Sequence, residues 1–233
     1  MAYLPASHRR PVNMRRQHAG FAWHQANTRA RIAANSKLKR LFDILVSASA
    51  LIFFLPALLA VAILIKLDSP GPILFKQKRW GKGGSEIVIY KFRSMKIDEC
   101  DTTGVKQTVH KDPRLTLMGT WLRRTNIDEL PQLWNILIGN MSLVGPRCHA
   151  IGMMAAGVPY EELVPNYAAR HAVKPGLTGL AQVRGLRGPT DRPSKAKSRI
   201  ACDLYYIQNY SIWLDLWILF ATIRNELRGG TGF

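Results

Sequence analysis

One uncharged apolar segment constrains this chain more than any other feature. From Ile44 to Ile65 the sequence reads ILVSASALIFFLPALLAVAILI, 22 residues without a charge. As one helix it would be about 33 Å long at roughly 1.5 Å per residue, close to the hydrocarbon thickness of a bilayer. This length favours a membrane segment over the buried core helix of a soluble protein.

Pro56 and the flanking charges favour a segment that enters one leaflet and returns. A proline in the middle of a helix removes a hydrogen bond and bends the helix axis. Lysines and arginines flank both ends, and such charges mark the cytoplasmic side of short loops. We therefore predict that residues 37–67 form a re-entrant helical hairpin kinked at Pro56, with a simple transmembrane span as the alternative.

The chain is strongly basic, with 33 Lys and Arg against 15 Asp and Glu and a formal charge of +18. Such an excess favours anionic partners, namely nucleic acid, lipid headgroups or phosphorylated substrates. Residues 1–36 hold no acidic side chain and no secretory signal pattern. We predict a disordered basic tail that lies along an anionic surface, with an organellar transit peptide as the alternative. Three scattered cysteines without CxxC spacing fit a reducing compartment.

Residues 68–233 have the mixed pattern of a small α+β domain. ILFKQ (73–77) and EIVIYKF (86–92), separated by GKGG, predict a β-hairpin. GPTDRPSKAKSR (188–199) indicates a polar, basic loop. Residues 204–228 predict one or two helices, whose broad apolar face is either core or an amphipathic surface at the membrane interface.

The stretch RRTNIDELPQLWN sets two acids side by side, Asp128 and Glu129, in this basic chain. The apolar residues that follow recur at helical spacing, and Pro131 is tolerated only in a first helical turn. A helix that begins at Asp128 or Glu129 is therefore expected. The pair then has a structural interpretation, because Asp is a favoured N-cap and Glu suits the first turn, and a functional one as reactive carboxylates.

Several stretches in the same order give the chain a family likeness. They read KRLFDILVSASALIFFLPALLAVAILIKLDSPGPILFKQKRWGKGG, YKFRSM, DPRLTLMGTWLRRTNIDELPQLWNILIGNMSLVGPR, VKPGLTGLAQVRG and DLYYIQNYSIWLDL. In them the chain resembles the bacterial sugar transferase family, the monotopic polyprenyl-phosphate phosphoglycosyltransferases that initiate exopolysaccharide and other surface glycans. The likeness covers roughly residues 37–225.

The resemblance implies a membrane-associated α/β (mixed α+β) enzyme on the cytoplasmic face of the bacterial inner membrane. Such an enzyme moves a phosphosugar from a nucleotide diphosphate sugar, usually a UDP-sugar, to undecaprenyl phosphate, and it releases UMP. Inner-membrane lipids are then further partners, and whether the chain forms a homo-oligomer stays open.

The resemblance also implies site residues. Asp128 would be the covalent nucleophile, and Asp128 and Glu129 would hold the required Mg²⁺, which prefers hard oxygen ligands. The substrate-binding residues for phosphate or nucleotide would be Lys91, Arg93, Arg123, Arg147, Thr178 and Gln182. The alternative for Lys91, Arg123 and Arg147 is ordinary solvated surface charge or a basic stripe that faces the membrane.

Three positions depart from the family pattern and leave the donor sugar open. Cys148 follows Arg147 where the family continues with proline, Ala181 stands where a large aromatic is common, and Leu186 stands where an arginine is expected. Either Arg184 or Arg187 would then replace that arginine.

A membrane-anchored basic scaffold that binds nucleic acid or anionic lipid without catalysis is the alternative function. It explains the charge but leaves the acid pair unexplained. The sequence has no helix-turn-helix, zinc-finger or RNP pattern, so we expect no nucleic-acid partner.

Overall fold

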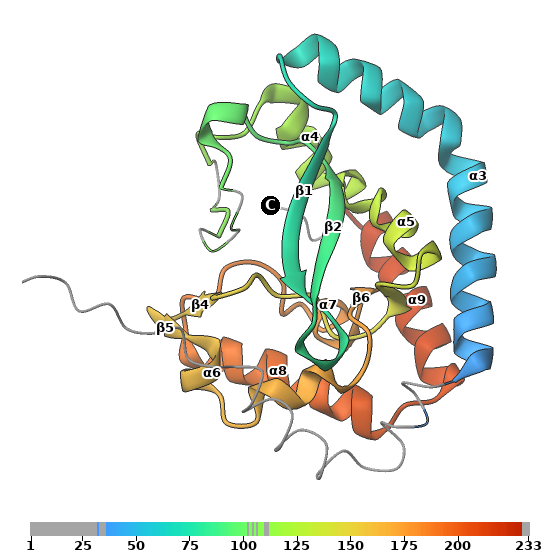
Figure 1. Cartoon of the computed structure of the whole chain (residues 1–233), viewed down its shortest axis with the longest axis vertical. Helices are drawn as coiled ribbons and strands as arrows, with labels where there is room; N and C mark the ends of the chain where they lie inside the picture. The colour runs from blue at the N-terminus through green and yellow to red at the C-terminus, as the bar shows by residue number, and fades with distance from the viewer. Residues whose placement is uncertain are drawn as a thin grey trace, which may run out of the picture.

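A computed structural model describes residues 32, 36–101, 103, 105, 107–109 and 112–229, so most of the predicted basic tail lies outside the described residues. The helices are α3 (Lys37–Asp68), α4 (Leu117–Arg124), α5 (Gln132–Leu137), α6 (Tyr160–Leu163), α7 (Leu180–Val183), α8 (Pro193–Gln208) and α9 (Ile212–Leu227). The strands are β1 (Leu74–Trp80), β2 (Glu86–Phe92), β3 (Ser142–Val144), β4 (Met154–Ala155), β5 (Val158–Pro159) and β6 (Gly176–Thr178). The 3₁₀ turns are η1 (Lys82–Gly84), η2 (Ile97–Glu99), η3 (Ile127–Glu129) and η4 (Tyr167–Ala172). The predicted mixture of helices and strands is confirmed (Figure 1).

The apolar segment forms one long helix, α3, which bends near its middle and follows one edge of the molecule (Figure 1). Pro56 lies inside it and accounts for the bend, because it cannot donate to the preceding turn. Residues 37–67 are thus one bent helix, not two helical arms joined by a turn. Among the described helices, α3 is the one long and apolar enough to cross a membrane. On which side its ends lie stays a prediction.

The N-terminal turns of α3 are fixed to the globular part by polar contacts. Lys39 forms an ion pair with buried Asp215 of α9 at 2.6 Å. Arg40 donates to the last two carbonyls of α5, at 2.5 and 2.7 Å, where the helix dipole favours a cation. Asp43, itself buried, accepts a hydrogen bond from the backbone N–H of Leu143 at 3.1 Å.

The predicted hairpin is confirmed as the antiparallel pair of β1 and β2, with register from Leu74↔Phe92 to Trp80↔Glu86. Asn135 of α5 fixes the free edge of β2. Its Oδ1 accepts from the N–H of Tyr90 at 3.0 Å, and its Nδ2 donates to the carbonyl of Val88 at 2.7 Å. Because this side chain is fully buried and both its ends are paired, it sets the distance between α5 and the hairpin.

Strands β3 and β6 pair in parallel, although they are far apart in the sequence. The backbones approach so closely that a Cβ on Gly176 would lie 2.1 Å from the backbone nitrogen of Gly145. Glycine is therefore required at this contact, and the chain leaves β3 toward Arg147 along a fixed path.

Two element predictions are wrong in their boundaries. The α5 helix begins at Gln132, and the acids precede it in the separate turn η3. Helix α8 begins at Pro193, so the second half of the predicted loop 188–199 is helical. Proline favours the first position of a helix, where its missing N–H has no partner to lose.

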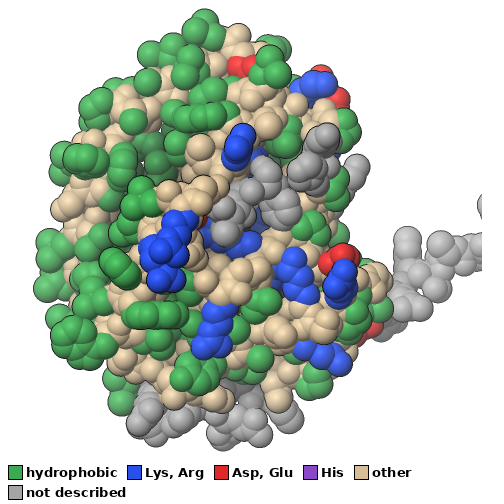
Figure 2. Space-filling model, turned by 180° about the vertical axis from the view of Figure 1, so that it is seen from behind, with side chains coloured by type: hydrophobic (Ala, Val, Ile, Leu, Met, Phe, Trp, Pro, Cys, Tyr) green, Lys and Arg blue, Asp and Glu red, His purple; other side chains and the backbone are tan. Residues whose placement is uncertain are grey.

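The apolar face of α9 is both core and surface. Ile218 and Ala221 are buried, whereas Trp213 is 76% and Phe220 67% exposed. Much of α3 is exposed too, including Ile52, Phe53 and Leu59. Figure 2 shows hydrophobic side chains gathered along the edge that α3 follows. Exposed apolar surface of this extent is typical of a protein that binds a membrane.

Candidate active site

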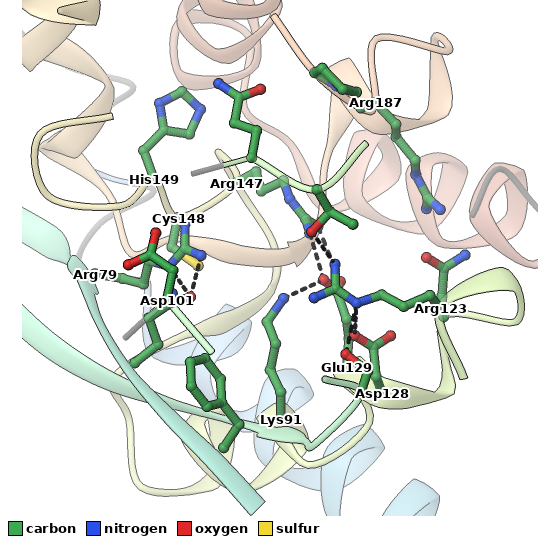
Figure 3. Close-up of a pocket in the computed structure, with 18 of the residues that line it drawn as sticks. Arg79, Lys91, Asp101, Arg123, Asp128, Glu129, Arg147, Cys148, His149 and Arg187 are labelled. Atoms are coloured by element: carbon green, nitrogen blue, oxygen red, sulfur yellow. Dashed lines mark hydrogen bonds and ion pairs between the residues drawn. The ribbon is translucent and has the colours of Figure 1, made fainter. Parts of the chain in front are cut away.

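A cavity of about 210 Å³ lies between one face of the hairpin and the turn η3. On β1, Phe75, Gln77 and Arg79 line it, because alternate residues of a strand point to the same face. Residues from the segment after β3 and from the loop after α7 close the other sides. Figure 3 shows charged side chains from these separate elements directed into this space.

The turn η3 presents the two acids to the cavity. It begins after Asn126, whose backbone is left-handed at φ 55° and ψ 13°. Asparagine tolerates this conformation better than most residues. Asp128 is only 2% exposed, and no side chain caps this turn. Asp128 is therefore not a solvent-facing N-cap of α5. Its carboxylate lies inside the cavity.

Glu129 is held by two cations. Arg147 binds it with both terminal nitrogens, Nη2 to Oε1 at 2.5 Å and Nη1 to Oε2 at 3.1 Å. Lys91 donates to Oε1 at 2.7 Å. Burial by itself would raise the pKa of Glu129, but Arg147 and Lys91 outweigh it and hold the pKa well below its usual range.

Asp128 has a weaker ionic partner. Arg123 Nε lies 3.4 Å from Asp128 Oδ2, and the same guanidinium donates to the hydroxyls of Ser94 at 2.9 Å and Thr108 at 3.1 Å. Burial raises the pKa of Asp128, although Arg123 and Lys91 oppose the shift. Two adjacent carboxyls thus have pKa values displaced in opposite directions, which is an arrangement typical of reactive pairs.

Lys91 and Arg147 reach Glu129 from different elements and share its Oε1. Lys91 comes from β2, and burial lowers its pKa. The pKa of Arg147 is raised by Glu129. The backbone carbonyl of Arg147 accepts a hydrogen bond from Arg170, which forms a fully buried ion pair with Asp203 at 2.8 Å. The segment that presents Arg147 is therefore anchored to α8.

Comparison with known proteins decides between the two functional hypotheses. The family model described as "Bacterial sugar transferase" matches residues 34–229. The chain belongs to the bacterial sugar transferase family. The sugar transferase enzyme expected from the sequence is thereby confirmed, and the family match favours it over a scaffold.

Curated relatives agree with this assignment. This sugar transferase is 65% identical over 196 residues to the exopolysaccharide production protein PSS of Rhizobium leguminosarum bv. phaseoli, covering 84% of this chain and 98% of that one. It is 47% identical over 189 residues to the UDP-glucose:undecaprenyl-phosphate glucose-1-phosphate transferase of Escherichia coli K12, covering 81% of this chain. It is 43% identical over 192 residues to the UDP-N-acetylgalactosamine-undecaprenyl-phosphate N-acetylgalactosaminephosphotransferase of Aeromonas hydrophila, covering 82% of this chain. The chain spans 40% and 44% of the length of the last two proteins.

The predicted site residues of the sugar transferase do not all meet at the cavity. Lys91, Arg123, Asp128, Glu129, Arg147 and Gln182 line it together, and Arg93 borders it. Arg93, however, donates to the carbonyls of Pro70, Ser69 and Ile65 and so holds the C-terminal end of α3. Thr178 is not among the described lining residues, and its hydroxyl pairs with that of Thr222 at 2.7 Å. A substrate role for Thr178 stays a prediction.

Among the residues that line the cavity without having been predicted as site residues are Arg79, His149 and Arg199. Arg79 donates to the amide oxygen of Gln77, and burial lowers its pKa. His149 is 1% exposed and shares a hydrogen bond with Tyr167 at 3.0 Å. The alternation of Phe75, Gln77 and Arg79 along one strand was the sequence signal for Arg79. His149 and Arg199 had no comparable signal.

The three departures from the family pattern, Cys148, Ala181 and Leu186, also line the cavity. Arg187 lines it as well and is therefore better placed than Arg184 to supply the expected arginine. Arg184 stacks over Tyr205 of α8, 5.7 Å from its ring centroid.

Metal-binding groups are sparse in the part of the chain that the structure describes. No cluster of three or more His, Cys, Asp or Glu side chains suitable for a metal occurs there. Asp128 and Glu129 offer two carboxylates, and both oxygens of Glu129 already accept from cations. Mg²⁺ is commonly held by one or two carboxylates together with substrate phosphates. The donor set therefore fits a Mg²⁺ that binds together with a diphosphate.

Proposed function

We propose that this sugar transferase moves a phosphosugar from a UDP-sugar to undecaprenyl phosphate and releases UMP, as the initiating step of a surface glycan. The observation that carries the proposal is the buried Asp128 carboxylate in a cavity walled by Arg123, Lys91 and Arg147. Two of the relatives named above use UDP-glucose or UDP-N-acetylgalactosamine with undecaprenyl phosphate, according to their names. UDP-glucose is the first donor to test, since several of the curated relatives are named for it.

The proposed reaction has two displacements at one phosphorus. In the first, a carboxylate oxygen of Asp128 attacks the phosphorus next to the sugar. The bond from that phosphorus to the bridging oxygen breaks, and UMP leaves with the electron pair. In the second, an oxygen of undecaprenyl phosphate attacks the same phosphorus and displaces the Asp128 carboxylate. The products are polyprenyl diphosphate sugar, UMP and the regenerated enzyme.

Asp128 is better suited than Glu129 to act as the nucleophile. Glu129 is occupied by Arg147 and Lys91 at 2.5 to 3.1 Å, whereas the nearest cationic nitrogen to Asp128 among the described residues is 3.4 Å away. A carboxylate that is not bound in a bidentate pair keeps a lone pair available for attack. The raised pKa of Asp128 also increases its basicity as a nucleophile.

The cations at the cavity overcome the repulsion between an anionic nucleophile and an anionic donor. Arg123, Lys91 and Arg147 come from three different elements and surround the acids (Figure 3). Arginine binds phosphate oxygens with two parallel hydrogen bonds, and such preorganised donors favour a transition state with negative charge.

Mg²⁺ is part of the proposal as the required cofactor. Asp128 and Glu129 would hold it together with donor phosphate oxygens, and when bound it supplies positive charge that neutralises them. We expect EDTA to abolish activity and added Mg²⁺ to restore it.

The proposed location is the cytoplasmic face of the bacterial inner membrane. The exposed apolar residues of α3 and α9 support membrane association, and an acceptor with a polyprenyl chain requires it. Anionic lipids would attract the basic surface, at about 1 kcal/mol per Lys or Arg near the membrane.

The test is UMP release by the full chain in lipid nanodiscs, given Mg²⁺, UDP-glucose and undecaprenyl phosphate. Asp128→Asn should lower the rate by about three orders of magnitude or more, because the carboxylate is the nucleophile. In wild type without acceptor, mass spectrometry should find a phosphohexose on Asp128. Full activity of Asp128→Asn would remove Asp128 from this role, and no UMP from any UDP-sugar would overturn the proposed reaction.

A further inference from the structure

Glu226, in the last turn of α9, connects two separate walls of the cavity. Its Oε1 accepts a hydrogen bond from Arg187 Nη1 at 2.9 Å, and its Oε2 accepts one from Asn126 Nδ2 at 3.0 Å. Arg187 and Asn126 are 39 and 100 residues away from Glu226 in the sequence. Both line the cavity, and Glu226 stands behind them.

The contact with Asn126 controls the turn that bears the nucleophile. Asn126 has a left-handed backbone, and its carbonyl accepts the N–H of Glu129 at 3.1 Å to close η3. A left-handed backbone at a non-glycine residue is higher in energy than a right-handed one. A hydrogen bond that holds the side chain of Asn126 therefore helps to keep its backbone in the left-handed conformation. Glu226 supplies that hydrogen bond, and η3 then holds Asp128 in place.

The contact with Arg187 controls the direction of a guanidinium. The backbone on both sides of Arg187 is already fixed, because Arg199 donates to the carbonyl of Leu186 at 2.9 Å and to that of Gly188 at 2.8 Å. Glu226 binds only one terminal nitrogen of Arg187. The Nε atom of Arg187 is buried and makes no hydrogen bond to any described residue, whereas the side chain as a whole keeps 16% exposure and lines the cavity, where an anion would meet it.

Arg187 lies on the same side of the cavity as Asp128 and Arg123 in Figure 3, away from Arg79 and His149. A guanidinium with one nitrogen fixed by a carboxylate and an adjacent N–H unpaired is suited to bind a phosphate oxygen. The chemistry of this position therefore matches a phosphate of the donor.

We propose that Glu226 is a positioning residue for phosphosugar transfer: it aims Arg187 at a phosphate of the nucleotide sugar and holds the turn that presents Asp128. This inference rests on the proposed function. It connects α9 to the reacting carboxylate of Asp128 through Asn126 and the turn η3. The other face of α9 is exposed and apolar.

The experiment measures UMP release by the full chain in nanodiscs with UDP-glucose and undecaprenyl phosphate. Glu226→Ala should lower kcat/KM by about 10- to 100-fold, since small displacements of positioned groups have effects of this size. We expect KM for UDP-glucose to rise because Arg187 is no longer held in place. We expect kcat to fall because Asn126 no longer holds the turn that presents Asp128. Glu162→Gln, which removes an exposed carboxylate on α6, is the matched control and should behave as wild type.

Double variants separate positioning from a general effect on folding. In an Arg187→Gln background, Glu226→Ala should leave KM for UDP-glucose unchanged, and in an Asn126→Ala background it should leave kcat nearly unchanged. Should Glu226→Ala fold poorly, Glu226→Gln, which keeps the shape and one hydrogen bond, should still raise KM.

The outcomes are distinct. An active wild type with Glu226→Ala unchanged, or with effects that simply add in the double variants, overturns the role of Glu226 alone. A wild type that releases no UMP from any UDP-sugar overturns the proposed function and the role of Glu226 with it.

Discussion

The neighbouring acids Asp128 and Glu129 have different electrostatic surroundings, although both lie in the turn η3. Glu129 accepts from a lysine and from both terminal nitrogens of an arginine, and its pKa lies well below the usual range. Asp128 is more deeply buried and has one ionic contact among the described residues, at 3.4 Å, and burial raises its pKa. The two residues therefore differ in burial and in partners, and the difference separates a fixed carboxylate from the proposed nucleophile.

The rate should depend on pH through Asp128. As pH falls through its raised pKa, the carboxylate becomes protonated and loses its nucleophilic lone pair, so kcat/KM should fall. Arg123 lowers this pKa. Arg123→Gln should therefore raise the pH at which kcat/KM falls on the acidic side of its pH profile. This shift is separate from any loss in the maximal rate. Arg124→Gln, at an exposed neighbouring position, should leave this pH unchanged. If the acidic side of the pH profile does not move in Arg123→Gln, the pH dependence does not come from Asp128.

At the scale of elements, helices and strands that are set by residues close in the sequence were predictable. Element boundaries that depend on contacts with distant residues were not. The hairpin β1–β2 follows from β-branched runs and a glycine-rich connection, and the structure contains it. The start of α5 was misplaced because the acids form the separate 3₁₀ turn η3, which follows the left-handed Asn126 that Glu226 of α9 holds. That contact spans 100 residues and leaves no local signal.

The candidate site divides in the same way. Motif residues such as Lys91, Arg147 and Gln182 do meet at the cavity. Thr178 belongs to an equally recognisable motif, yet its hydroxyl pairs with Thr222 of α9. The sequence motif alone does not show whether a residue faces the cavity or contacts a neighbouring helix. The three-dimensional structure is needed to distinguish the two.

The junction between η4 and α8 should be sensitive to charge. Arg170 and Asp203 are each about 98% buried and form an ion pair at 2.8 Å. Asp203→Asn would leave the buried guanidinium uncompensated, which costs about 3–5 kcal/mol in such pairs. We expect a clearly lower midpoint of thermal unfolding in detergent, against an unchanged midpoint for Glu162→Gln. An unchanged midpoint in Asp203→Asn would mean that solvent reaches this pair.

Helix α9 should lie at the membrane surface. Trp213, Trp217 and Phe220 are exposed on one of its faces, and aromatic residues favour the headgroup region. In a variant without its native cysteines, a nitroxide at position 220 should be relaxed more by lipid-soluble oxygen than by an aqueous nickel chelate. A nitroxide at position 162 on α6, far from α3 in Figure 1, should show the reverse. Equal accessibility at both positions would place α9 in solvent.

At the scale of the whole molecule, the apolar surface and the basic surface are arranged around one cavity. The bent helix α3 supplies exposed apolar side chains along one edge (Figures 1 and 2). The cavity opens among arginines and lysines from the hairpin, α4 and the segment after β3. Such a molecule is suited to bring a water-soluble anion to an anionic headgroup on a membrane.

The bend in α3 should determine which side of the membrane holds the N-terminus. With Pro56 inside the helix, both ends are expected on the cytoplasmic side. Pro56→Leu restores the missing hydrogen bond and favours a straight helix long enough to span. An N-terminal tag should be inaccessible from the periplasm in wild type and accessible in Pro56→Leu. Ala57→Leu serves as the control. A tag accessible in wild type would contradict the re-entrant topology.

The attachment of α3 has a consequence for any attempt to obtain the catalytic part alone. Arg40 caps α5, Asp43 binds the backbone of β3, and Val61 and Ile65 share a buried cluster with Phe92 and Leu122. Helix α3 is therefore a structural component of the enzyme and not a detachable segment. Removing it would uncover a hydrophobic core and free the C-terminal carbonyls of α5. A truncated fragment would be prone to aggregate, and detergent or lipid has to accompany the intact chain wherever its activity is studied.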